Sequence, residues 1–231
     1  GAVAKLGEER VRVAGKGSRA DLRPDGGIDD IEVLPNGSTR WRWRGHEVSL
    51  PLPGRLNVRN GLLALGVAVE LGVEEEVAIR GVAGVTSARL RGEWHQIGDL
   101  RVLADCYNSN PPSVRGAVDL IATLPAEGDK VVVLGTMREM GERTAEIHRQ
   151  VANDVAARLG DGVDQVVATG AFVDAFAAAA PDDPRVIRWA DPLEAYHQLA
   201  GRLHGNETIL LKASRGEALE RWLPLLREEW E

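Results

Sequence analysis

The second half of the chain alternates between short apolar runs and longer stretches with helical spacing. The runs at 131–134 and 209–211 are continuously apolar, which is typical of parallel strands buried on both faces. The pattern predicts five strands, at 100–105, 130–134, 165–169, 185–189 and 208–212. Each is followed by a predicted helix, at about 112–124, 143–159, 171–180, 191–203 and 215–228. Five β–α units in series predict an α/β fold with a Rossmann-like, open and mostly parallel sheet flanked by helices.

The first 50 residues or so favour strands instead, with a short alternation at 11–13 and an Asn-Gly turn signal at 36–37. In the Arg-Trp-Arg-Trp-Arg stretch at 40–44, a strand places both tryptophans on one side and the arginines on the other. Basic residues interleaved with aromatic ones could bind single-stranded nucleic acid. Because the whole chain is acidic, we expect the tryptophans to face a core and the arginines to face solvent.

Helical spacing begins at Asn57 and continues to about residue 72, and a second short helix is predicted at 74–82. Asn57 and Asn60 are three residues apart, so they project from the same side of the first turn. One of them could cap the helix. A carboxamide can also pair with the edge of a purine, so a nucleotide contact stays open as a second interpretation.

Composition and charge exclude several classes of protein. The 231 residues carry a net charge of −7, which argues against a nucleic-acid binder. No apolar run approaches the roughly 18 residues that a membrane span requires. The single cysteine and the lack of a signal-peptide pattern predict a cytoplasmic protein. The stretch at 83–87 resembles a linker, and we expect two domains, at 1–86 and 87–231.

Three predicted loops follow strands at the carboxyl side of the sheet, where open α/β proteins bind ligands. They are residues 105–110, 135–141 and 212–216. The first is rich in hydrogen-bonding side chains and leads into a helix that opens with two prolines. A polar strand end that faces a helix N-terminus favours a ligand site. The charged side chains that the three loops offer are Asp105, Arg138, Glu139, Lys212 and Arg215.

Several of these side chains also have a simpler interpretation. Thr136 and Ser214 each precede a glutamate by three residues, which is the spacing of a capping box. Lys212 could be a solvated charge at a strand end, and Asp105 could cap the turn that follows it. Cys106 is expected to pack as a small core residue.

Other catalytic signatures fail on spacing. The five histidines are scattered along the chain, so no zinc site is predicted. The Gly-Lys-Gly-Ser stretch at 15–18 lacks the residues that a phosphate loop needs around it, and we interpret it as a turn. No Gly-x-Gly-x-x-Gly fingerprint follows any predicted strand.

An ordered series of motifs remains. It consists of Leu-Pro-Gly-Arg-Leu-Asn-Val-Arg-Asn at 52–60, Arg-Gly-Glu at 91–93, Asp-Cys-Tyr-Asn-Ser-Asn-Pro at 105–111, Val-Leu-Gly-Thr-Met-Arg-Glu-Met-Gly at 133–141, His148, and Lys-Ala-Ser-Arg-Gly at 212–216. This series resembles the Mur ligases, and its Tyr-Asn-x-Asn-Pro element resembles their MurF type. The resemblance implies an ATP-dependent amide ligase that adds D-alanyl-D-alanine to UDP-N-acetylmuramoyl-tripeptide through an acyl phosphate, with Mg²⁺, in peptidoglycan synthesis. Through the cell wall, it also implies a part in cell shape and division.

The resemblance implies roles for the matched positions. Asn57 and Asn60 lie where the family contacts the adenine of ATP, and Arg91 and Asp105 lie where it holds the ribose. The incoming dipeptide is expected at Tyr107, Asn108 and Asn110. Three further residues are candidates for the dipeptide carboxylate or for nucleotide phosphates, namely Lys212, Ser214 and Arg215. The expected partners are small molecules rather than nucleic acid or a membrane, and a monomer is expected.

This chain departs from the family pattern at Leu56, Leu90, Thr136 and Ala213, where His, Gly, Asp and Gly are usual. The phosphate loop, the carbamylated lysine, the Mg²⁺ ligands and the UDP-binding domain of the family would all lie before Gly1. We therefore expect the remainder of a central ATP-binding domain, followed by a C-terminal ligase domain, with no catalytic residue or metal ligand assigned and no activity in isolation. The alternatives are another Mur or folylpolyglutamate-type ligase and a noncatalytic nucleotide- or peptide-binding module.

Overall fold

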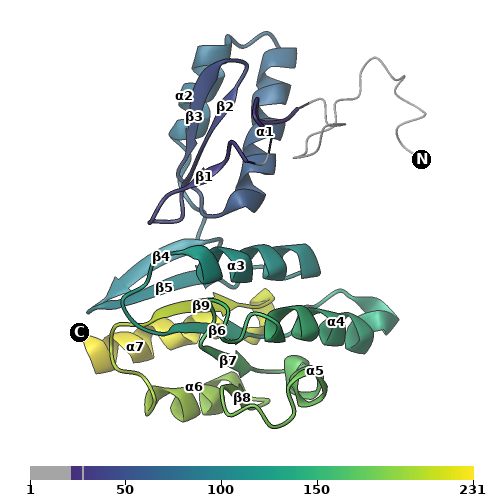
Figure 1. Cartoon of the computed structure of the whole chain (residues 1–231), viewed down its shortest axis with the longest axis vertical. Coiled ribbons are helices and arrows are strands. Elements are labelled where there is room, and N and C mark those ends of the chain that lie inside the picture. The colour runs from purple at the N-terminus through teal and green to yellow at the C-terminus, as the bar shows by residue number, and fades with distance from the viewer. Residues whose placement is uncertain (1–21, 28) are drawn as a thin grey trace. The chain divides into compact units, whose positions relative to one another are not determined.

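The computed structural model describes residues 22–27 and 29–231, and the chain divides into two compact units, Gly1–Thr86 and Ser87–Glu231 (Figure 1). The alternation at 11–13 and the glycine-rich stretch at 15–18 lie outside the described residues. Each unit has a hydrophobic core of its own.

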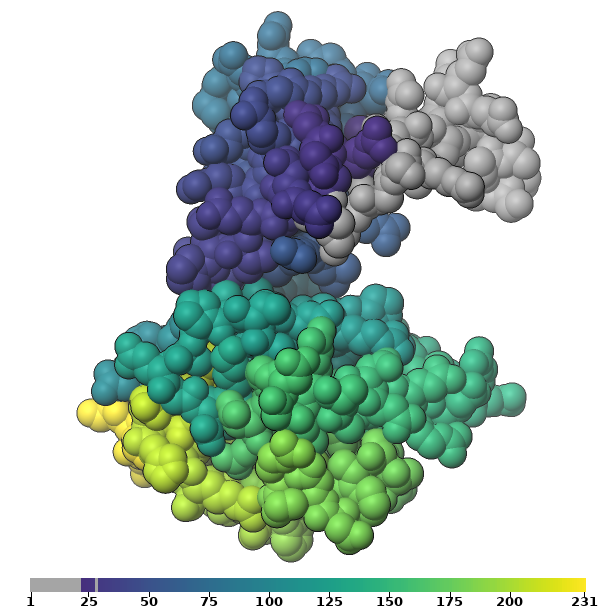
Figure 2. Space-filling view, in the orientation of Figure 1, coloured from purple at the N-terminus to yellow at the C-terminus, as the bar shows by residue number. Residues whose placement is uncertain are grey.

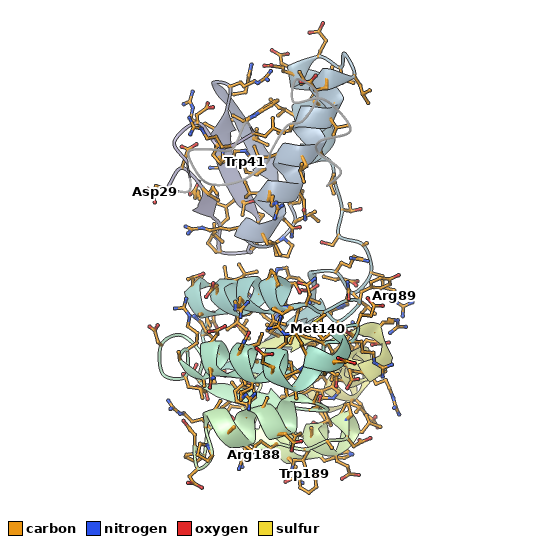
Figure 3. All side chains as sticks on the ribbon, turned by 90° about the vertical axis from the view of Figure 1, so that its right-hand side faces the viewer. Asp29, Trp41, Arg89, Met140, Arg188 and Trp189 are labelled. Carbon is orange, nitrogen blue, oxygen red and sulfur yellow. The ribbon has the colours of Figure 1, made fainter. Side chains whose placement is uncertain are left out.

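The first unit combines a three-stranded antiparallel sheet with two helices (Figure 1). Its elements are β1 (Glu32–Val33), β2 (Thr39–Trp43), β3 (His46–Leu50), α1 (Arg55–Glu70) and α2 (Glu75–Ala83). Trp41 and Trp43 are buried in the core while Arg42 is exposed, so the predicted tryptophan face is confirmed. Trp41, labelled in Figure 3, lies against Gly61 of α1, where an added Cβ atom would be 3.1 Å from the indole ring. The missing side chain of Gly61 therefore allows the helix and the sheet to approach closely.

The second unit contains a six-stranded sheet with the order β4–β5–β9–β6–β7–β8. Its strands are β4 (Glu93–Ile97), β5 (Leu100–Asp105), β6 (Lys130–Leu134), β7 (Gln165–Ala168), β8 (Val186–Arg188) and β9 (Thr208–Lys212). Its α-helices are α3 (Pro111–Thr123), α4 (Thr144–Ala156), α5 (Phe172–Ala179), α6 (Pro192–Ala200) and α7 (Trp222–Trp230). All strands run parallel except β4, so the predicted fold class is confirmed.

The two faces of this sheet are covered by different helices. Val131 and Val133 belong to a core cluster that includes Tyr196 of α6 and Trp222 of α7. The intervening Val132 is also buried and points to the opposite face. On that side α3 contacts β6 and β9, and the regions of α3 and α4 cover much of the visible face in Figure 2. Burial on both faces explains why these strands are continuously apolar.

The position of β9 decides where the loops meet. The chain leaves β5 and forms β6, β7 and β8, and β9 then inserts between β5 and β6. In register, Lys212 stands opposite Asp105 on one side and Leu134 on the other. The carboxyl ends of β5, β9 and β6 are thus adjacent at a point where the strand order reverses, which is the usual ligand position in such folds.

The sequence prediction missed strand β4. This strand pairs with β5 through the two-residue connection Gly98-Asp99, and Gly98 has φ +52°. A Gly-Asp pair between two apolar segments is a recognised hairpin signal, so the information was present. As an antiparallel edge strand in which only Ile97 is buried, β4 lacks the continuous apolar run that marks the central strands.

The helix predicted at 215–228 is wrong in its first half. The segment forms two short 3₁₀ helices, η4 (Arg215–Glu217) and η5 (Leu219–Arg221), and α7 begins at Trp222. Ala218 between them is left-handed, with φ 52°, which interrupts the helical hydrogen bonding. Pro224 was the available signal, because proline is tolerated only in the first turn of a helix.

Candidate functional site

Three loops of the second unit are joined by hydrogen bonds at the carboxyl ends of β5, β9 and β6. The backbone N–H of Arg215 donates to the carbonyl of Tyr107 at 3.1 Å. The N–H of Ser214 donates to the carbonyl of Thr136 at 3.2 Å, and the N–H of Arg138 donates to Oγ of Ser214 at 2.9 Å. The loops that the sequence placed at this edge of the sheet therefore form one connected group.

Lys212 lies inside this group with a side chain only 1% exposed. Its Nζ donates to the carbonyl of Asp105 at 3.2 Å and to that of Asn108 at 2.6 Å. It also pairs with Oδ2 of Asp105 at 3.2 Å. Burial lowers the pKa of Lys212, while the Asp105 carboxylate acts in the opposite direction. The interpretation of Lys212 as a solvated charge is therefore wrong, because its neighbours are strands on both sides.

Asp105 keeps part of its carboxylate at the surface. One oxygen faces Lys212, and the side chain is 25% exposed. Asp105 pairs with the lysine instead of capping the next turn, so that alternative is wrong. An ionised carboxylate held in this way can still accept hydrogen bonds from hydroxyl groups of a ligand.

Asn110 is the N-cap of helix α3. Its Oδ1 accepts from the N–H of Ser113 at 3.0 Å, and Oγ of Ser113 accepts from the N–H of Asn110 at 3.1 Å. Pro111 and Pro112 have no N–H, and the N–H of Val114 donates to the carbonyl of Asn110. The first turn of α3 therefore has no free backbone donor, so a ligand at this strand end would be bound by side chains of the loop rather than by the N–H groups of the helix. Only the amide nitrogen of Asn110 remains outside the cap.

Tyr107 and Asn108 are the exposed members of the first loop. The Tyr107 side chain is 46% exposed, and the Arg91 guanidinium lies over its ring at 4.1 Å from the centroid. The N–H of Tyr107 donates to the carbonyl of Leu90 at 3.1 Å. Oδ1 of Asn108 accepts from the N–H of Ser109 at 2.8 Å. Of the ten predicted site residues, these two are exposed together with Asn60, Arg91 and Arg215.

The capping boxes predicted for Thr136 and Ser214 are wrong. Oγ1 of Thr136 accepts from the N–H of Ala171 at 3.1 Å, and Oγ of Ser214 accepts from Arg138. No side-chain cap forms at the 3₁₀ helix that follows Ser214. Both hydroxyls link loops that are distant in sequence, and the guanidinium of Arg215 pairs with Glu220 while remaining largely exposed.

Two residues that the sequence does not place among the predicted site residues hold the loop at 135–141. Nε2 of buried His148 accepts from the N–H of Met137 at 2.9 Å, and its Nδ1 lies 2.7 Å from the carbonyl of Thr144. His148 is therefore neutral with the proton on Nδ1, and burial lowers its pKa. Glu217 pairs with Arg138 at 3.3 Å. The spacing of Glu217 after Ser214 indicates a capping box, and the structure places Glu217 in this ion pair instead.

Cys106 packs in the core as predicted. Its side chain is buried, and burial, together with the neighbouring Asp105, raises the pKa of the thiol to about 11. A thiol with so high a pKa stays protonated and is a poor nucleophile.

Asn57 and Asn60 belong to the first unit, on the first turns of α1. Nδ2 of Asn60 donates to Oδ1 of Asn57 at 3.0 Å, and Nδ2 of Asn57 donates to the carbonyl of Pro53 at 2.8 Å. The N-cap position is Gly54, with φ 84° and no side-chain cap. The prediction that Asn57 and Asn60 project from the same side of the helix is confirmed. The prediction that one of them caps the helix is wrong.

Among residues 22–27 and 29–231, no group of three or more His, Cys, Asp or Glu side chains could hold a metal ion. No described helix is both long enough and apolar enough to cross a membrane.

The open parallel sheet, with polar loops gathered where its strand order reverses, defines the second unit as a Rossmann-like domain of the ligand-binding class. A family model, described as the glutamate ligase domain of Mur ligases, matches residues 90–215, which is more than half of the chain. The chain therefore belongs to the Mur ligase family.

Three relatives define this similarity further. The UDP-N-acetylmuramoyl-tripeptide–D-alanyl-D-alanine ligase of Treponema pallidum is 35% identical over 203 residues, covering 86% of this chain and 43% of that protein. A crystal structure of MurF from Acinetobacter baumannii aligns with a TM-score of 0.78 at 25% identity, over 92% of this chain and 46% of that one. MurF ligase from Thermotoga maritima, in complex with ADP, shares the fold with a TM-score of 0.68 at 22% identity. This alignment covers 89% of this chain and 47% of that one. The chain thus spans less than half the length of these relatives.

Proposed function

We propose that this chain is part of an ATP-dependent MurF-type ligase, which joins D-alanyl-D-alanine to UDP-N-acetylmuramoyl-tripeptide in peptidoglycan synthesis. The observation that carries the proposal is the similarity to the Treponema ligase of that reaction, which extends over 86% of the chain. Residues 1–86 would complete a central ATP-binding domain, and 87–231 would form the C-terminal ligase domain. We further propose that the enzyme acts as a monomer in the cytoplasm, where it serves cell-wall growth, cell shape and division.

ATP is the proposed nucleotide because the Thermotoga relative holds ADP. In this chain Asp105 would accept hydrogen bonds from the ribose hydroxyls, and Arg91 would donate to them. The partly exposed carboxylate of Asp105 fits that role. Asn57 and Asn60 would meet the adenine, for which Asn60 offers an exposed carboxamide. No described cluster fits Mg²⁺, so no residue of this chain is given a part in metal chemistry.

The dipeptide would lie against Tyr107, Asn108 and the amide nitrogen of Asn110, with its carboxylate near Ser214 or the exposed Arg215. In the proposed reaction ATP phosphorylates the terminal carboxylate of the tripeptide. The dipeptide amine then attacks the acyl phosphate, and phosphate leaves as the amide forms. This chain would contribute by binding and orienting the amine, which accelerates the reaction by raising the effective concentration of the nucleophile.

Phosphate release by the complete ligase that contains this chain tests the proposal. We expect release that requires ATP, the UDP-tripeptide and D-alanyl-D-alanine together, and none from the 231-residue chain alone. Release by the complete ligase that does not depend on the dipeptide would reject the proposed substrate.

Asn110 offers a sharper test because its two functions can be separated. Asn110→Asp keeps the oxygen that caps α3 but loses the amide donor. We therefore expect the KM for the dipeptide to rise about tenfold, which corresponds to a loss of ~1.4 kcal/mol in binding free energy. The stability of the protein should not change, because aspartate caps a helix as well as asparagine does. The matched control is Ser113→Ala, which breaks the reciprocal bond of the cap and should leave this KM unchanged. An unchanged KM in Asn110→Asp would remove Asn110 from the binding site and leave it a cap only.

A further inference from the structure

Lys212 has no donor left for a ligand. An ammonium group carries three N–H donors. They face three acceptors, which are the carbonyls of Asp105 and Asn108 and Oδ2 of Asp105, at 3.2, 2.6 and 3.2 Å. The side chain is 1% exposed, so a substrate carboxylate or phosphate cannot reach it without disrupting the loop.

The three acceptors lie at the two ends of one short segment, 105–108. Between them, Tyr107 is held on both sides of its backbone, by the carbonyl of Leu90 and by the N–H of Arg215. Lys212 thus fixes the end of β5 and the turn after it, and the directions of the Asp105 carboxylate, the Tyr107 ring and the Asn108 side chain follow from that backbone.

We propose that Lys212 is a positioning residue, which orients Asp105 for the nucleotide and Tyr107 with Asn108 for the dipeptide while it touches neither. This proposal rests on the proposed function for the identity of the two ligands. A lysine suits the position because its stem is apolar and its head satisfies two main-chain oxygens and one carboxylate at once. An apolar side chain of the same length would leave these acceptors unpaired inside the protein, and the segment would turn towards water instead.

Lys212→Met in the complete ligase is the direct test, since methionine is of similar length and has no donor. We expect the KM for ATP and the KM for D-alanyl-D-alanine each to rise at least tenfold. We also expect the amide protons of Tyr107 and Arg215, which close the hydrogen bonds of this segment, to exchange at least tenfold faster. The matched control is Lys130→Met, because Nζ of Lys130 donates to the carbonyl of Ala122 at the opposite end of neighbouring β6. This control should change neither KM nor the exchange at Tyr107 and Arg215.

A fall in kcat with both KM values and both exchange rates unchanged would overturn the proposal. If Lys212→Met does not fold, Lys212→Gln is the second variant, because its side chain retains one donor group. We expect intermediate KM values and exchange rates from it. KM values and exchange rates equal to those of the wild type would overturn the proposal. Hydrogen exchange requires no substrate. If the complete ligase does not use D-alanyl-D-alanine as a substrate, the proposed function is rejected. The amide exchange rates of Tyr107 and Arg215 would still decide whether Lys212 holds the segment.

Discussion

Leu90 occupies a backbone position that glycine would adopt more easily, with φ 60°. A left-handed conformation costs a non-glycine residue roughly 1–2 kcal/mol. The Leu90 side chain is 3% exposed within the core of the second unit, and burying a leucine contributes more, since truncation of such a side chain to alanine costs about 2–5 kcal/mol. Packing of the Leu90 side chain in the core therefore explains why a leucine can stand where the family usually has glycine. The carbonyl of Leu90 also binds Tyr107, so the strained residue holds the site loop.

Ser109 leads to a prediction at the same scale. Its hydroxyl is buried, and no residue in the described part of the chain bonds to it. Since an unpaired buried hydroxyl costs about 1–3 kcal/mol, we expect Ser109→Ala to raise the free energy of unfolding by about 1 kcal/mol in urea titrations. Ser113→Ala is the matched control, because it removes a bonded hydroxyl and should lower stability by about the same amount. A loss of stability in Ser109→Ala would mean that the hydroxyl is satisfied.

At the scale of elements, helix α4 and the loop after β6 are joined by one neutral histidine. Protonation of His148 would place an N–H on Nε2 directly against the N–H of Met137. Burial accordingly lowers the pKa of His148 below its ordinary value of 6.5, against a smaller opposing effect of the Thr144 carbonyl and of Glu217. The unfolded chain then binds this proton more readily than the folded one.

The resulting prediction concerns stability against pH. The contribution of His148 is fully present above about pH 6.5, the pKa in the unfolded chain, and is lost progressively as the pH falls below it. The slope from one such group is at most about 1.4 kcal/mol per pH unit. Urea unfolding of the wild type and of His148→Gln between pH 7.5 and 5 isolates the contribution of His148, because His95, the other described histidine with a lowered pKa, is present in both proteins. Equal slopes would show that His148 titrates normally.

On the scale of the whole molecule, the described buried residues that form the large core of the second unit lie between Leu90 and Leu226, and the first unit has a core of its own. We therefore predict that residues 87–231 fold without the first unit. The amide NMR spectrum of this fragment should overlay on the corresponding signals of the whole chain, with cooperative thermal unfolding.

The control is a fragment that starts at Leu100. It lacks β4 and the buried side chains of Leu90 and Ile97, so it should unfold at a clearly lower temperature. An unfolded 87–231 fragment would show that the second unit needs the first one for its stability.

The sequence by itself determined the α/β class, because apolar periodicity reports which local segments are buried on one face or on both. It located the five parallel strands, the tryptophan face of β2 and the loops that carry the candidate site. It also contained signals that went unused, namely Gly98-Asp99 for the β4–β5 hairpin and Pro224 for the start of α7.

Only the tertiary structure decided what the polar residues do. The insertion of β9 between β5 and β6 brings Lys212 to Asn108 across 104 positions of sequence, and no local pattern encodes that distance. Local patterns suggested a solvated lysine and two capping boxes, and each interpretation proved wrong. The physical reason is that a polar group in a folded protein bonds to whichever partner burial brings near it, and that partner is set by the order of the strands.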